Sequence, residues 1–132
     1  MKLCITATGK NLDAQVDPRF GRAEYFIIID PDTMAFEALE NASLNAMHGA
    51  GIQAAQLMST KGVTAVITGQ VGPNAFHTLK AAGIEMFHTK ASSAAETVDA
   101  YKKGQLKPIA EMGAAHAGMG GRKGTAGGRG MN

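Results

Sequence analysis

The chain has 132 residues, of which 45% are hydrophobic and 18% charged, with a formal net charge of +2. This length suits one domain with a single core, and the apolar content excludes a disordered chain. No apolar run approaches the roughly 20 residues that span a bilayer, and no signal-peptide pattern precedes the first predicted strand. One cysteine excludes an internal disulfide and an all-cysteine metal site within one chain. We therefore expect a cytoplasmic domain.

The charge is uneven along the chain. Residues 113–132 hold three basic side chains and no acidic one, whereas the preceding 112 residues carry a net charge of −1. The body therefore lacks the basic footprint of a nucleic-acid-binding domain.

The first 40 residues predict three strands. Residues 2–8 alternate, with Leu3, Ile5 and Ala7 on one face and Cys4 on the other. A polar loop runs from residue 9 to about 22. A second strand spans 24–30, and a turn at Asp30-Pro31-Asp32 leads into a third strand over 34–40.

The pattern then changes to alternating helices and strands. A helix opens at residues 49–51 and ends at Gly62, and a buried strand follows over 63–68. A second helix spans 73–82, with proline at its first position, and a fifth strand spans 84–87. A last helix, capped by Ser92 or Ser93, runs to about residue 103.

This order (strand, strand, strand, helix, strand, helix, strand, helix) predicts an α/β fold with a mixed five-stranded sheet and flanking helices. Right-handed crossovers place the first strand centrally, beside the fourth. The loops that begin near Gly9, Gly69 and His88 then meet at one end of the sheet, where open α/β sheets bind ligands. The third strand forms an exposed edge, so we expect a monomer or a weak homodimer.

The fold-forming pattern stops near residue 110. Residues 113–132 contain eight glycines and no periodicity, which predicts that residues 1–110 form the domain and 111–132 a flexible tail. The side chains of Met112, His116 and Met119 could hold copper(I) there, but the composition favours a solvated tail with no such role.

Several short motifs resemble one protein family in the same order along the chain. They are Asp17-Pro18-Arg19-Phe20-Gly21-Arg22-Ala23 before Tyr25-Phe26, His48-Gly49-Ala50-Gly51, Gly62-Val63 through Thr68-Gly69, Gly72-Pro73-Asn74-Ala75 and Ala82-Gly83-Ile84. Together they resemble the dinitrogenase iron–molybdenum cofactor biosynthesis family, which includes NifX, NafY and the C-terminal part of NifB. A tail rich in glycine, methionine and arginine also occurs in stand-alone members.

The resemblance implies a ribonuclease-H-like fold and a NifX-like domain. It also implies non-covalent binding of an iron–sulfur or molybdenum–iron–sulfur cluster, or of a precursor, by a carrier or storage protein. The related orange proteins hold a molybdenum–copper sulfide cluster, so the metals of the cluster stay open. The implied partners are cluster donor and acceptor proteins.

Catalysis is not expected. A nuclease of this fold needs carboxylates that hold two divalent ions about 3.5–4 Å apart. The predicted first strand has no acidic residue. An enzyme that acts on a phosphorylated metabolite would also need an acid–base pair, and none is evident.

Three residues are candidate metal ligands. Cys4 is either an inert small core residue or, if it faces a cavity, the one thiolate available to a soft metal. His48 precedes a helix start and His88 follows the fifth strand, so both are at loop positions from which a side chain can reach a ligand. Each is equally well explained as an exposed or hydrogen-bonded histidine without a ligand, and it is the family resemblance that makes the two histidines candidate contacts to a cluster, since an open metal accepts imidazole.

The remaining candidates suit a negatively charged ligand. Gly69 and Gly72 allow close backbone approach, and the helix after Pro73 presents free N–H groups. Arg19 and Arg22 add charge-assisted hydrogen bonds. Asn74 orients the loop or donates to the ligand. These features are also found in ordinary loops between strand and helix.

The main hypothesis is a carrier for an anionic metal–sulfur cluster. The alternative is a regulatory domain that senses a non-metal anion or binds a protein partner.

Overall fold

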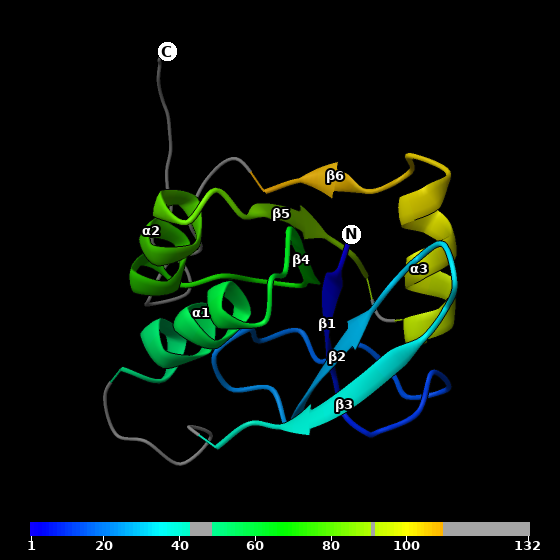
Figure 1. The fold of residues 1–132 in the computed structure, drawn as a ribbon, viewed down its shortest axis with the longest axis horizontal. Coiled ribbons are helices and arrows are strands. Elements are labelled where there is room, and N and C mark those ends of the chain that lie inside the picture. Colours follow the sequence, from blue (N-terminus) through cyan, green and yellow to red (C-terminus); the bar gives the residue numbers. More distant parts are fainter. Residues whose placement is uncertain (43–48, 91, 110–132) are drawn as a thin grey trace.

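The computed structural model describes residues 1–42, 49–90 and 92–109. A mixed sheet lies between two helix layers, with α1 and α2 on one face and α3 on the other (Figure 1). The elements are β1 (Leu3–Ala7), β2 (Tyr25–Ile29), β3 (Phe36–Glu40), α1 (Ala50–Thr60), β4 (Ala65–Thr68), α2 (Pro73–Ala81), β5 (Glu85–His88), α3 (Ala94–Lys102) and β6 (Lys107–Pro108).

The sheet has the order β3-β2-β1-β4-β5-β6. β1 pairs antiparallel with β2 and parallel with β4, and β5 is parallel to β4. The central position of the first strand and its place beside the fourth are therefore confirmed. Crossovers through α1 and α2 explain this arrangement, because each returns the chain to start the next parallel strand.

Alternation along β1 divides the interior into two cores. Leu3, Ile5 and Ala7 pack toward α3 and its residue Val98. Cys4 packs on the other face with the buried residues of α1 and α2, among them Met58 and Leu79. Every residue of β1 is buried, since helices cover both faces of the central strand.

Three features differ from the sequence prediction, and the first is that β4 begins at Ala65 rather than residue 63. The sheet has six strands rather than five, because Lys107 and Pro108 pair antiparallel with the end of β5. A two-residue strand that contains proline has no periodic signal. β3 begins at Phe36 rather than residue 34, because Met34 adopts a left-handed φ of 65° and its N–H donates to the Asp30 carbonyl at 2.7 Å.

The helix ends follow the predicted signals. Gly62, Gly83 and Gly104 have φ between 69° and 75°, a conformation that glycine adopts without strain. Ser93 caps α3, with its side chain accepting from the Glu96 N–H at 3.1 Å and Glu96 accepting in return.

Within the described ranges, no helix is long and apolar enough to cross a membrane. The predicted tail and its candidate copper ligands lie outside the described residues. The ribonuclease-H-like assignment stays a prediction.

Candidate functional site

A cleft of about 480 Å³ lies where three segments of the chain meet. The segments are residues 19–22 from the loop after β1, residues 49–52 at the start of α1, and residues 70 and 72–75, which run from the loop after β4 into the start of α2. Two of these segments follow the carboxyl ends of the parallel strands β1 and β4, which is the expected ligand-binding end of the sheet.

Small residues let the three segments approach one another. A methyl group added at Gly21 would lie 2.9 Å from the Gly51 Cα, and one added at Gly51 would lie 3.1 Å from the Ala75 Cβ. The loop, the start of α1 and the start of α2 therefore touch through backbone and single carbon atoms. The close contact brings both helix starts to one cleft.

Buried polar contacts anchor the loop to the sheet. The Thr6 hydroxyl donates to the Asp17 carbonyl at 2.6 Å, and the Asp17 N–H donates to the Thr6 carbonyl at 2.9 Å. The hydroxyls of Thr6 and Thr68 lie 2.8 Å apart, which joins the ends of β1 and β4 to the same loop. These bonds fix the loop residues that follow Asp17.

The starts of α1 and α2 supply backbone donors. Their cap residues, Gly49 and Gly72, make no side-chain cap hydrogen bond, and neither first turn contains an acidic residue. The first-turn N–H groups of a helix have no intrahelical acceptor and carry its partial positive charge. An anion in the cleft would meet both helix starts.

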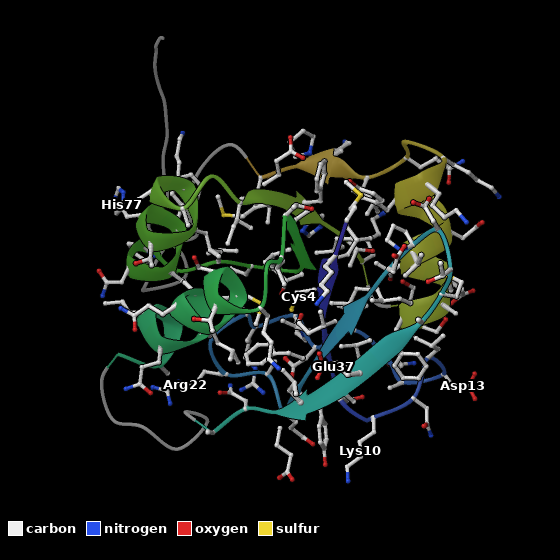
Figure 2. The ribbon with its side chains drawn as sticks, in the orientation of Figure 1. Cys4, Lys10, Asp13, Arg22, Glu37 and His77 are labelled. Atoms are coloured by element: carbon white, nitrogen blue, oxygen red, sulfur yellow. The ribbon has the colours of Figure 1, made fainter. Side chains whose placement is uncertain are left out.

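Two arginines add full positive charge. The Arg19 side chain is 61% exposed, and its Nε lies 3.4 Å from the carboxylate of buried Asp17, which also accepts the Arg19 N–H at 3.0 Å. Arg22 is partly buried, and Figure 2 shows it beside the start of α1. Among the described residues that line the cleft, these two are charged and none is acidic.

The structure brings four of the predicted anion-binding residues together. Arg19, Arg22, Gly72 and Asn74 line the cleft. Gly69 does not line the cleft. It packs so closely against Pro18 that a methyl group added at Gly69 would lie 2.8 Å from the Pro18 Cα. Its small size serves the contact between loops.

The predicted metal ligands are not gathered at the cleft. Cys4 is completely buried on β1, in the core between the sheet and α1 and α2, and burial raises the pKa of its thiol (Figure 2). His88 is exposed at the end of β5, and its Nδ1 lies 2.9 Å from the Gly69 carbonyl. His48 lies outside the described residues, next in sequence to the cleft residue Gly49.

Sequence reasoning missed other residues that shape the site. Gly21 and Gly51 stand in the motifs already noted, but a glycine that permits a tertiary contact has no local signature. The same holds for Asp17, because its bonds to Arg19 and Thr6 become visible only in the folded structure. The described residues hold no group of three or more histidine, cysteine, aspartate or glutamate side chains suited to a metal ion.

Comparisons with known proteins agree with this fold. The apo form of the orange protein from Desulfovibrio gigas superposes with a TM-score of 0.80 and 42% identity, covering 83% of this chain and 92% of that one. The NifB-like protein TM1290 from Thermotoga, assigned to the DUF35 family, gives 0.77 and 37%, covering 87% and 98%. The sequence is 32% identical over 96 residues to the uncharacterized protein MJ0580 of Methanocaldococcus jannaschii, covering 70% of this chain and 81% of that protein.

The family described as dinitrogenase iron–molybdenum cofactor matches residues 1–104, which include every buried residue of both cores and every residue that lines the cleft. The expected family resemblance is thus confirmed over most of the chain. The chain belongs to the dinitrogenase iron–molybdenum cofactor family.

Proposed function

We propose that this protein is a cytoplasmic carrier or storage protein that holds an anionic metal–sulfur cluster, or a precursor of one, in the cleft. One observation carries the proposal: two arginines and two helix starts converge on a cleft whose described lining has no acidic residue. Family membership favours a metal–sulfur cluster over other anions.

The physical character of the cleft fits such a cargo. Its volume lies within the range of about 300–1,000 Å³ that is usual for small-ligand sites. Hydrogen bonds from charged groups contribute about 1.5–3 kcal/mol each, so one such bond from each of Arg19 and Arg22 would strengthen the binding of an anionic cluster. The glycines at positions 21, 49, 51 and 72 expose backbone that a bulky cluster can approach.

In this proposal the protein binds its cargo and does not turn it over, with donor and acceptor proteins delivering and removing the cluster. The cargo is an iron–sulfur, molybdenum–iron–sulfur or molybdenum–copper species. His48, which is next in sequence to the cleft residue Gly49, is the proposed direct ligand to an open metal, and His88 is left out because it does not line the cleft. Cys4 is left out, because a buried thiol with a raised pKa is a poor ligand for a cluster held at the cleft.

The test compares Arg19→Gln/Arg22→Gln with Lys102→Gln/Lys103→Gln, which removes two charges from exposed positions on α3 and its end. Anaerobic titration with tetrathiomolybdate measures the affinity. We expect the arginine pair to weaken binding by at least about tenfold, since two charge-assisted contacts are lost, and the lysine pair to change it little. Equal losses in both variants would contradict a role for the cleft.

Reconstitution with iron, sulfide and thiomolybdate tests the cargo itself. We expect stoichiometric bound metal with sulfide charge-transfer bands, reduced by His48→Ala and unchanged by His88→Ala, since His88 does not line the cleft. A colourless, metal-free protein that binds inorganic phosphate at the cleft would instead support the non-metal anion-sensing alternative.

A further inference from the structure

Asn41 donates three hydrogen bonds to residues 21–24, a short segment whose first two residues line the cleft. It directly follows β3 and is only 8% exposed. Its Nδ2 donates to the Gly21 carbonyl at 3.0 Å and to the Ala23 carbonyl at 2.8 Å. Its backbone N–H donates to the Glu24 carbonyl at 3.0 Å. One side chain therefore holds the chain at two carbonyls that flank a single residue.

That flanked residue is Arg22, which lines the cleft. The same segment is confined from the other side, because Gly21 packs against the backbone of Gly51 at the start of α1. The backbone on both sides of Arg22 is thus fixed between the end of β3 and the start of α1. The clamp holds the backbone from which the Arg22 side chain extends.

We propose that Asn41 is a positioning residue for the anion site, acting through Arg22. The inference rests on the proposed function, since it assigns a further residue to the same cleft. Asn41 does not line the cleft and has no contact with the cargo. Its role is to hold the arginine in the geometry that a bound anion meets, so that little conformational entropy is lost on binding.

Asparagine is suited to this task because both Nδ2 hydrogens are used on two different carbonyls. An aspartate carboxylate can only accept hydrogen bonds, so it could not bond to the carbonyls of Gly21 and Ala23. An apolar residue would leave both carbonyls without these donors. Leucine has nearly the shape of asparagine and introduces no charge, so Asn41→Leu removes the polar side-chain contacts and keeps the backbone N–H bond to the Glu24 carbonyl.

The first measurement is the affinity of the full-length protein for tetrathiomolybdate. We expect Asn41→Leu to weaken it by about tenfold, as is usual when a residue that orients a ligand-binding side chain is lost. Val98→Ala, which removes buried volume from the core on the opposite face of the sheet, controls for lost stability. Its affinity should stay within about twofold of the wild type.

Double-mutant cycles separate positioning from general damage. In an Arg22→Gln background, Asn41→Leu should lose most of its effect, because there is no guanidinium left to position. In an Arg19→Gln background it should keep its full effect. An equal effect of Asn41→Leu in both backgrounds, or none in the wild type, would overturn the proposal.

A readout that needs no cargo distinguishes this inference from the proposed function. In NMR spectra, Asn41→Leu should move the Arg22 Nε–H and Gly21 N–H resonances, whereas Val98→Ala should not. If these shifts occur in a protein that does not bind tetrathiomolybdate, the carrier function fails and the positioning of Arg22 stands. If the Arg22 resonance does not move, the positioning role is wrong whatever the affinities are.

Discussion

The single cysteine illustrates how burial decides the chemistry of one residue. Alternation along residues 2–8 places Cys4 on the face opposite Leu3 and Ile5, but it does not say which face meets a cavity. In the structure that face is filled by α1 and α2, so the thiol is surrounded by apolar side chains. Burial disfavours the charged thiolate and raises the pKa above its ordinary value of 9.0.

This raised pKa predicts how stability depends on pH. Above about pH 9 the unfolded chain loses the thiol proton while the folded chain keeps it, so the free energy of unfolding falls by up to about 1.4 kcal/mol per pH unit. Below that pH the contribution is fully present. Cys4→Ala removes the titrating group, so the stability difference between wild type and variant should be constant below pH 8 and shrink above pH 9.

Urea unfolding between pH 7 and about pH 10.5 measures both proteins. A stability difference that does not change across this range would show that the thiol titrates normally in the folded state. The native protein should also resist alkylation by iodoacetamide, because a protonated, buried thiol is unreactive.

At the scale of elements, the cleft depends on how closely a loop and two helices approach. Sequence alone predicts the starts of both helices from glycine and proline signals. It does not predict that Gly21, Gly51 and Ala75 form one contact, because these residues are far apart in the chain and glycine serves many purposes.

Two glycine substitutions at this cleft should differ in their effect on stability, with one destabilising the protein and the other leaving its stability nearly unchanged. Gly21→Ala places a methyl group 2.9 Å from the Gly51 Cα, so backbone must move, and we expect a stability loss of about 1–3 kcal/mol with weaker tetrathiomolybdate binding. Gly72→Ala is the control, since its φ of −71° suits alanine and nothing lies within 4 Å of the added group. Its stability should change by no more than about 0.5 kcal/mol.

Urea denaturation and anaerobic titration of the two variants provide the measurement. Equal stability losses in both would show that the Gly21 contact does not hold the cleft together.

At the scale of the whole molecule, the two sheet edges differ. β6 is short and consists of lysine and proline, which protect an edge from pairing. β3 is a longer edge strand with partly exposed Phe36. Its charged side chains are the two glutamates at positions 37 and 40. A monomer or weak homodimer stays the prediction for this edge.

The described cores predict that the domain is independent of the tail. Ile109, the last described residue, is partly buried and packs against the core between the sheet and α1 and α2, and its N–H donates to the Met86 carbonyl at 2.8 Å. A chain that ends at residue 110 should therefore unfold in urea within about 0.5 kcal/mol of the full chain and bind tetrathiomolybdate equally well.

Lower stability of the shortened chain would place part of the core contacts in residues 111–132. Unchanged stability with weaker binding would instead give the tail a role in holding the cargo.

Sequence determined the order of elements, the central first strand and the ends of the helices, because these depend on local periodicity, turn residues and the handedness of crossovers. It also indicated that Arg19, Arg22, Gly72 and Asn74 belong to one end of the sheet. The strand β6 was not predicted, because two residues are too few to show an alternation of apolar and polar side chains.

Only the tertiary structure decided which candidates share a cleft. The packing of Gly69 on Pro18, the burial of Cys4 and the position of His88 all depend on contacts between residues distant in the chain. The clamp from Asn41 to the segment that carries Arg22 has the same origin. Local sequence specifies where the backbone turns, whereas the approach of one turn to another is set by packing across the whole core.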